Sequence, residues 1–137
     1  MIELKILIDA LLESVPDVSA IYLFGSHSSG DDRTDSDVDI AILPSRDQAC
    51  AFEPVKLFSI REQLAARCSR DVDLVDLRAA PVVLAKEVIA ADRRVFCSDP
   101  DHADEFEMLT LSLYQKLNDE RRDILRAGLA GEKFYVS

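Results

Sequence analysis

Two pairs of carboxylates stand at the starts of two apolar segments of the 137-residue chain. Asp37 and Asp39 open one segment, and Asp71 and Asp73 open the other. Residues two apart on a strand point to the same face, so the two side chains of each pair share a face. Close carboxylates repel one another unless a cation lies between them, and Mg2+ or Mn2+ favours such hard oxygen ligands. Asp37 and Asp39 are therefore candidate metal ligands.

A glycine and a serine follow the apolar strand that precedes the first pair. Gly25 has no Cβ, so the chain can turn sharply there and a phosphate can approach the backbone. Ser26 adds a hydroxyl donor, and a short helix beginning at residues 26–29 would add free amides. In the loop before the second strand, Ser36 and Arg33 are further candidate nucleotide contacts, although Arg33 suits a surface ion pair equally well. An anion site thus adjoins the cation site.

A third carboxylate is available from the second pair. In two-metal phosphoryl transfer, one ion activates the attacking oxygen and the other steadies the triphosphate and its leaving group. A third carboxylate can hold the ion on the attacking side and help to remove the proton of the nucleophile. We assign this role to Asp73, with Asp71 as the alternative. A single Asp-x-Asp or Gly-Ser pair is usually an ordinary strand end or turn, so the prediction depends on the whole set.

The spacing of these residues resembles that of a known family. Gly25-Ser26, ten residues, and then Asp37-x-Asp39 is similar to the signature of the polymerase-β-like nucleotidyltransferase superfamily. The small size of the chain indicates its minimal nucleotidyltransferases (MNT proteins), and the resemblance covers residues 20–76. Many relatives carry arginines shortly after the Gly-Ser pair, whereas this chain has a histidine and two serines there.

The resemblance implies roles, a reaction and a partner. Gly25 and Ser26 would contact the triphosphate, and Asp37, Asp39 and Asp73 would hold Mg2+. Many minimal nucleotidyltransferases are antitoxins of HEPN/MNT toxin–antitoxin modules, which implies transfer of AMP from ATP to a tyrosine of a HEPN ribonuclease toxin. Two alternatives stay open: adenylylation of a small cationic acceptor, and an antitoxin that neutralises its partner by binding alone.

The composition limits the partners that the chain can bind. A formal net charge of −10 and a pI near 4.6 oppose extended contact with a nucleic acid backbone and suit a basic partner. No stretch is apolar over the length of a bilayer and no secretory signal is present, so we expect a cytoplasmic protein without membrane contact. Three widely spaced cysteines indicate neither a disulfide framework nor a zinc site.

Apolar spacing predicts the elements that must position these residues. Helical periods and alternating or buried apolar runs follow one another along the chain. The expected elements are a helix over 2–13, a strand from 21, a strand ending at 43, a helix over 52–67, a strand over 70–77, a helix from 81, a short strand over 94–97 and a long last helix. They predict an α/β (α+β) fold, with a short mixed sheet flanked by helices in a single domain of residues 1–137.

The last helix is apolar over much of its circumference. Asp99 and Asp101 can cap it. Its main stripe is Phe106, Leu109, Leu113 and Leu117, widened by Met108, Leu111 and Tyr114. Such a helix is either deeply buried or meets another chain, and a small domain has little room to bury it. We therefore expect residues 100–137 to form a partner interface.

Overall fold

Helices and strands follow one another along the chain in the order that the sequence predicts. The structure, a computed structural model, describes residues 3–25, 38–47, 52–69 and 71–131. In chain order the elements in these ranges are α1 (Glu3–Ser14), β1 (Ala20–Phe24), β2 (Val38–Leu43), α2 (Pro54–Cys68), β3 (Val72–Asp76), α3 (Val82–Ala90), β4 (Arg94–Cys97) and α4 (Pro100–Gly131). The predicted short mixed sheet flanked by helices is confirmed. None of the helices in the described ranges combines the length and the hydropathy that a membrane span needs.

The sheet has the strand order β3-β2-β1-β4. β1 is antiparallel to both β2 and β4, whereas β2 and β3 are parallel and α2 makes the crossover between them. The end of β1 and the starts of the other three strands therefore lie at one end of the sheet. At that end the register pairs Phe24 with Asp39 and Asp39 with Asp73.

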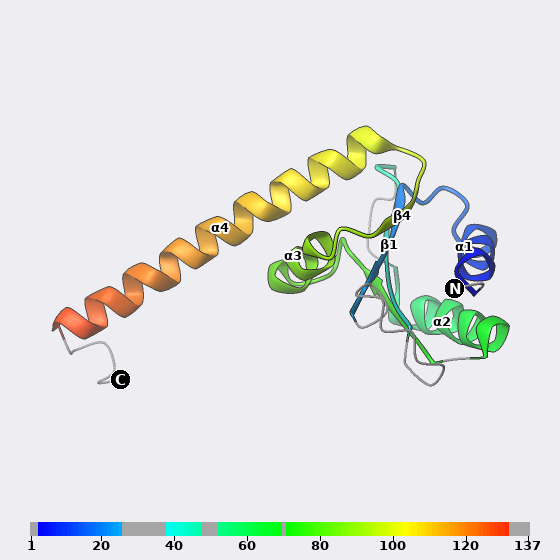
Figure 1. The fold of residues 1–137 in the computed structure, drawn as a ribbon, viewed down its shortest axis with the longest axis horizontal. Coiled ribbons are helices and arrows are strands. Elements are labelled where there is room, and N and C mark those ends of the chain that lie inside the picture. The colour runs from blue at the N-terminus through cyan, green and yellow to red at the C-terminus, as the bar shows by residue number, and fades with distance from the viewer. Residues whose placement is uncertain (1–2, 26–37, 48–51, 70, 132–137) are drawn as a thin grey trace.

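Side chains that alternate along the strands build a core on each face of the sheet. On one face, strand residues pack against α1 and α2, chiefly through Ile21, Ile40, Ile42, Leu7, Leu11, Ile60 and Leu64. On the other face, strand residues pack against α3 and the start of α4, through Ala20, Tyr22, Ala41, Leu43, Ala85, Val88 and Ala103. Figure 1 shows α1 and α2 on one side of the sheet and α3 on the other. By alternation, Asp39 and Asp73 belong to the second face.

One local contact ends α2 before β3, and others hold the far end of the strand. α2 ends at Cys68, and its cap residue Ser69 takes a left-handed conformation (φ 58°) and donates its N–H to the carbonyl of Ala65. At the far end of β3, the buried carboxylate of Asp76 accepts hydrogen bonds from the backbone N–H groups of Phe52 (3.1 Å) and Arg78 (3.0 Å). Asp76 thus ties the segment that enters α2 to the end of β3, a role that the sequence pattern did not reveal.

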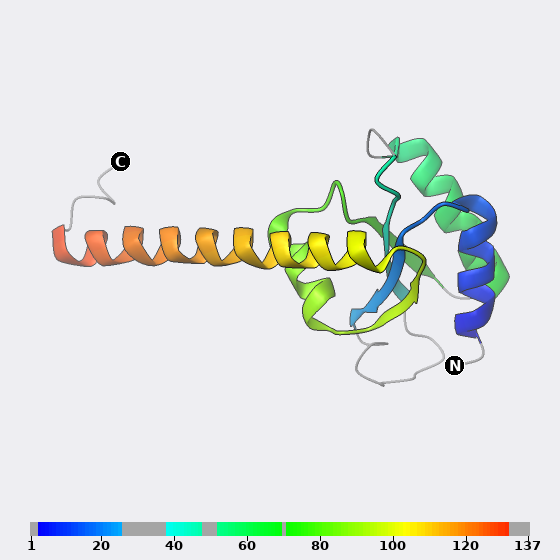
Figure 2. The ribbon, with the colours of Figure 1, turned by 90° about the horizontal axis from the view of Figure 1, so that it is seen from above.

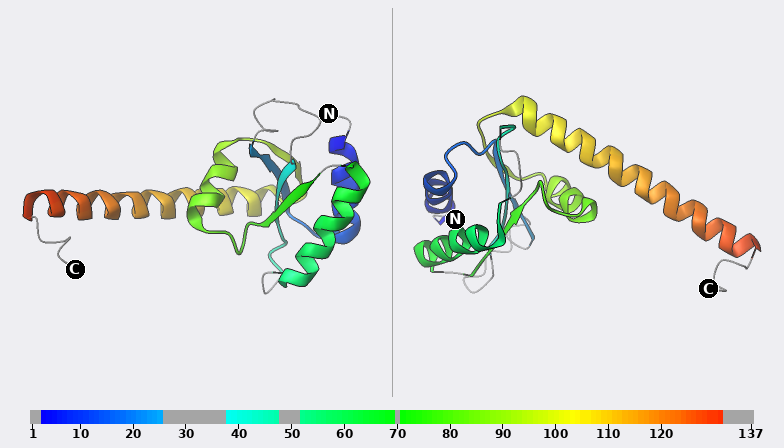
Figure 3. Two further views of the ribbon diagram at one scale, coloured as in Figure 1. Left: turned by 90° about the horizontal axis from the view of Figure 1, so that it is seen from below. Right: turned by 180° about the vertical axis from the view of Figure 1, so that it is seen from behind.

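α4 starts on the sheet and then extends away from the domain. Asp99 caps it by accepting the N–H of His102 (3.1 Å), as predicted, and Ala103 and Thr110 are buried. Beyond the part that packs on α3, the helix projects clear of the other elements in every view (Figures 1, 2 and 3). Leu109 and Leu113 of the predicted stripe are 60% and 44% exposed. Phe106 of the same stripe packs on the domain beside Ala103, and Thr110 is also buried, so the domain covers only part of the predicted apolar side.

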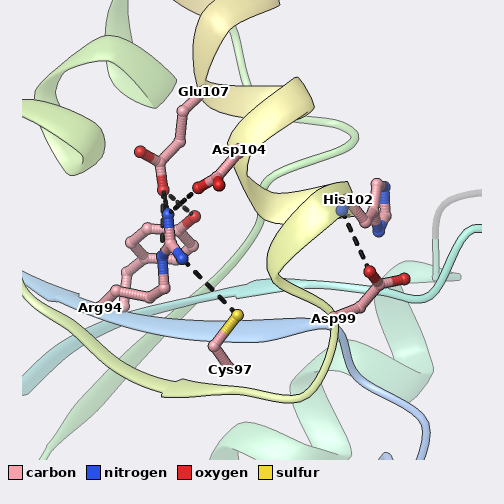
Figure 4. Close-up of polar contacts among 7 residues, drawn as sticks. Arg94, Cys97, Asp99, His102, Asp104 and Glu107 are labelled. Atoms are coloured by element: carbon pink, nitrogen blue, oxygen red, sulfur yellow. Dashed lines mark hydrogen bonds and ion pairs between the residues drawn. The ribbon is translucent and has the colours of Figure 1, made fainter.

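A polar cluster fastens α4 to the sheet (Figure 4). Tyr22 of β1 donates a hydrogen bond of 2.6 Å to Oε2 of Glu107 on α4. Nη2 of Arg94 on β4 lies 2.7 Å from the same oxygen and 2.8 Å from Oδ1 of Asp104. Burial and the bond to Glu107 raise the pKa of the Tyr22 phenol above its ordinary value, so the phenol remains a donor. Bonds to Asp104 and Glu107 likewise hold the pKa of Arg94 above its ordinary value.

Replacement of Glu107 by alanine should destabilise the protein. The change removes the acceptor that the buried Tyr22 and the half-buried Arg94 share, so we expect the free energy of unfolding to fall by about 2–4 kcal/mol. Urea denaturation measures this loss. The matched control is Glu105→Ala on the same helix, because the exposed pair of Glu105 with Arg46 should contribute less than about 1 kcal/mol. Equal effects of the two changes would show that the cluster does not hold α4.

His102, in the first turn of α4, lies in a half-buried position. Its Nδ1 is 2.7 Å from the hydroxyl oxygen of the buried Ser19. Burial first, and then the charge of Arg46, lower the pKa of His102 below its ordinary value of 6.5. The neutral imidazole and the Ser19 hydroxyl therefore form a second polar tie between α4 and the start of β1.

Candidate active site

Three neighbouring strands bring a glycine and two carboxylates to one end of the sheet. Gly25 directly follows β1, Asp39 is the second residue of β2, and Asp73 is the second residue of β3. The parallel register places Asp73 directly beside Asp39, and the antiparallel register places Phe24 beside Asp39 on the other side. Neighbouring strands lie about 4.8 Å apart. Asp39 thus lies between the glycine turn and the second carboxylate.

The turn at Gly25 is built directly against the Asp39 carboxylate. Gly25 has φ 76°, in the left-handed region that side chains with a Cβ rarely adopt. A Cβ placed on Gly25 would overlap Oδ2 of Asp39. The dihedral angle therefore favours glycine, and a Cβ here would have to displace the Asp39 carboxylate. A group that approaches this turn meets backbone and a carboxylate together.

The register distinguishes the two aspartates of the second pair. Asp73 lies opposite Asp39, whereas Asp71 precedes β3 and its carbonyl accepts the N–H of Val38 (2.9 Å). Asp39 is half-buried and Asp73 is exposed. Since the paired position is the one nearer to Asp39, the geometry favours Asp73 over Asp71 as the carboxylate that acts together with Asp39.

Several predicted site residues lie outside the described ranges. They are Ser26, Arg33, Ser36 and Asp37. Within those ranges no cluster of three acidic, histidine or cysteine ligands occurs, since the site contributes only Asp39 and Asp73. Two carboxylates from adjacent strands fit Mg2+, which commonly keeps water and substrate phosphates in the rest of its shell. The donor set at this end of the sheet therefore suits such an ion.

Two cavities adjoin this end of the sheet. One, of about 300 Å³, lies beside the outer strand β3 and is lined by Arg61, Glu62, Ala65, Asp71, Val72 and Asp73. The other, of about 330 Å³, lies beside β1 and β4 and is lined by Tyr22, Ile89, Asp92, Arg93, Arg94 and Glu107. The backbone carbonyl of Arg93 accepts the N–H of Leu23 (2.9 Å), which places Arg93 across from the end of β1. The sequence pattern did not single out Arg93, because the pairing of β4 with β1 joins segments far apart in the chain.

A family model and a protein of known activity are similar to this chain in sequence. The family model described as "Polymerase beta, Nucleotidyltransferase" matches residues 7–101. The protein adenylyltransferase MntA of Shewanella oneidensis is 37% identical over 120 residues, which cover 87% of this chain and 82% of the relative.

Two solved structures of toxin–antitoxin complexes contain similar chains. One is a complex with AMP-PNP, whose matching chain has a TM-score of 0.77 and 34% identity, covering 94% of this chain and 99% of that one. The other is the tri-AMPylated Shewanella oneidensis HEPN toxin in complex with its MNT antitoxin. There the TM-score is 0.70 and the identity 32%, covering 93% of this chain and 95% of that one.

Proposed function

The chain belongs to the polymerase beta nucleotidyltransferase family, and from this premise we propose that it is an antitoxin that AMPylates a HEPN toxin. The reaction would transfer AMP from ATP to a tyrosine of the toxin and silence it, in the cytoplasm where both proteins and ATP meet. A protein adenylyltransferase among the relatives and a tri-AMPylated toxin beside a similar antitoxin support this proposal.

The observation that carries the proposal is the pairing of Asp39 with Asp73 beside the turn at Gly25. Adenylyl transfer needs carboxylates that hold a divalent ion next to a place where phosphates approach the backbone. Both parts stand at one end of the sheet, on strands whose register is fixed by cores on both faces. A solvated Asp-x-Asp at a strand end would not require glycine packed against its carboxylate.

Each residue of the candidate site would have its own role in the transfer of AMP. Asp39, Asp73 and the predicted Asp37 would hold Mg2+, which supplies charge neutralisation for the phosphates when it is bound. Gly25 lets the triphosphate approach the backbone. The tyrosine oxygen forms a bond to the α-phosphorus, the bond from that phosphorus to the pyrophosphate breaks, and Asp73 accepts the tyrosine proton. The protein contributes mostly position and charge.

The acceptor side would come from the toxin, docked on the projecting helix. Ile124 and Leu125 of α4 are 60% and 59% exposed, on a stretch of helix that leaves the domain (Figure 2). A helix gains most of its stability from packing of its apolar side, and this stretch has none within the described chain. We therefore assign residues 100–137 to the interface with the toxin, and the net charge of −10 would favour a basic surface on that partner.

Intact mass spectrometry tests the proposed reaction. The full chain is incubated with its cognate toxin, ATP and Mg2+, and the toxin should gain mass in steps of one AMP. Asp39→Ala with Asp73→Ala should give no adduct while the complex still forms. No adduct with the wild type, together with full neutralisation by the double variant, would instead identify an antitoxin that acts by binding. Adduct formation on a small cationic acceptor without the toxin would identify the other alternative.

A charge on the projecting part of α4 should weaken the complex. Leu125→Asp places a carboxylate in the proposed apolar contact, so we expect the dissociation constant for the toxin to rise about 10-fold or more, by isothermal titration calorimetry. Affinity for AMP-PNP should stay unchanged, because Leu125 belongs to the part of α4 that projects from the domain, whereas the candidate nucleotide site lies at one end of the sheet. The control is Ser112→Asp, an exposed polar position of the same helix. An unchanged toxin affinity in Leu125→Asp would place the interface elsewhere.

A further inference from the structure

β3 forms one edge of the sheet. In the strand order β3-β2-β1-β4 it pairs with β2 alone, and no strand of the described residues lies on its other side. The carbonyl of Asp71 and the N–H of Leu77, just before and just after the strand, both bond to β2 (2.9 Å each). Backbone groups point alternately to the two sides of a strand. The N–H and C=O groups of Val72 and Leu74 therefore point outward, away from β2.

The side chain of Asp73 stands beside this edge. Asp39 and Asp73 pair in register and share one face, so a row of site residues runs from the Gly25 turn across β2 to β3. The next position in this row, about 4.8 Å beyond Asp73, lies outside the sheet. A residue on a strand added to β3 would occupy that position, with its side chain on the face of the two carboxylates.

A cavity accompanies the edge on the side of α2. The cavity of about 300 Å³ is lined by Arg61, Glu62, Ala65, Asp71, Val72 and Asp73. It adjoins both the outer edge of β3 and one carboxylate of the candidate site. The guanidinium of Arg61 lies over the ring of Phe58 (5.1 Å to its centre) and 3.9 Å from Glu62. Three carboxylates and one guanidinium leave the lining with a negative balance.

We propose that the toxin presents its acceptor tyrosine on an extended, basic segment that adds to the outer edge of β3, with the tyrosine opposite Asp73. This inference rests on the proposed function and concerns the way in which the acceptor reaches the site. Backbone hydrogen bonds to Val72 and Leu74 hold the segment. The carboxylates of Asp71, Asp73 and Glu62 favour positive charge on it, and they disfavour a second copy of this chain, whose edge carries the same charges.

The arrangement accounts for tyrosine as the acceptor. An ion held by the carboxylates keeps the phosphates farther from the sheet than the carboxylate oxygens are. The phenol of a tyrosine reaches farther from its backbone than an aspartate does, whereas the hydroxyl of a serine stays closer. The bonds made and broken are those of the proposed reaction: the phenol oxygen bonds to the α-phosphorus, pyrophosphate leaves, and Asp73 accepts the phenol proton.

Amide hydrogen exchange tests the edge directly. The full chain is bound to its cognate toxin with Mg2+ and α,β-methylene ATP, from which AMP is not transferred, and exchange is followed by NMR. The N–H groups of Val72 and Leu74 should exchange about 10-fold or more slowly in the complex than in the free chain. Those of Asp73 and Val75, which face β2, should be protected in both. Unchanged exchange of Val72 and Leu74 would overturn the inference, and their protection in the concentrated free chain would identify a second copy instead.

Proline at the edge separates the backbone from the side chain. Val72→Pro removes an outward N–H and leaves the bonds to β2, a change that edge strands tolerate. Val72→Ala is the matched control, because it loses the side chain and keeps the N–H. AMP transfer to the toxin should be about 10-fold or more slower in Val72→Pro than in Val72→Ala, while both variants bind AMP-PNP like the wild type. Equal transfer by the two variants, both folded by thermal unfolding, would overturn the role of the edge.

The outcomes separate this inference from the proposed function. If the wild type transfers AMP but Val72 and Leu74 stay unprotected in the complex, the proposed function stands and the acceptor reaches Asp73 by another path. If the wild type transfers no AMP to the toxin, the proposed function falls and this inference falls with it. The exchange measurement decides alone if Val72→Pro does not fold.

Discussion

Asp39→Asn should lower the rate of AMP transfer to the toxin about 1,000-fold or more while the domain stays folded. The change removes the charge of the carboxylate that lies between the Gly25 turn and Asp73, so the ion and the triphosphate lose their shared anchor. The side chain is half-buried rather than part of the core, and asparagine keeps its shape. Single-turnover kinetics measure the loss, and thermal unfolding checks the fold.

The second pair of aspartates provides a matched comparison. Asp73→Asn should also reduce transfer by orders of magnitude, whereas Asp71→Asn should stay within about threefold of the wild type, since Asp71 precedes the strand. Both residues are exposed, both lie in the same short segment, and both lose one charge. If Asp71→Asn were inactive and Asp73→Asn active, the assignment from the register would be wrong.

Gly25→Ala should impair both activity and stability. The added Cβ overlaps the Asp39 carboxylate and the left-handed backbone resists any Cβ, so we expect about 100-fold lower transfer and a loss of about 1–3 kcal/mol in the free energy of unfolding. Kinetics and urea denaturation measure the two effects. Gly25→Asn separates the causes, because asparagine tolerates this backbone conformation better but still carries the Cβ.

A double-mutant cycle tests the contact itself. In an Asp39→Ala background the oxygen that overlaps the new Cβ is absent, so Gly25→Ala should cost less stability there than in the wild type. The remaining cost reports the backbone dihedral and the Asp39 Cβ. Equal costs in the two backgrounds would mean that the carboxylate does not rest against the turn. Full activity in Gly25→Ala would rule out close phosphate approach at this position.

The fold was predictable because its elements carry strong local patterns. The alternation of Val72 to Leu77 and the apolar run that ends at Leu43 could only be buried as strands, and Pro81 correctly indicated the start of α3. The mixed sheet follows from α2, which joins β2 and β3 in parallel, and from β1, which pairs antiparallel with β2 and β4. The approach of Asp73 to Asp39 could also be anticipated, because each is the second residue of its strand.

Contacts between distant segments could not be read from the chain. Tyr22 and Glu107 are 85 positions apart, and neither residue type indicates that a hydrogen bond joins them. Arg93 gains its place from the pairing of β4 with β1, which local patterns do not specify. Of the predicted stripe on α4, Phe106 packs on the domain whereas Leu109 stays exposed. Helical periodicity gives the width of an apolar surface, and only tertiary packing decides which part stays exposed.

The most direct measurement follows the phosphorus atoms of ATP. The full chain, its toxin and Mg2+ are incubated with ATP that carries a radioactive label on either the α- or the γ-phosphate. The account predicts that the α label becomes bound to the toxin and that the γ label leaves as pyrophosphate, with neither event in Asp39→Asn. A γ label on the toxin, or no label transferred by the wild type, would contradict it.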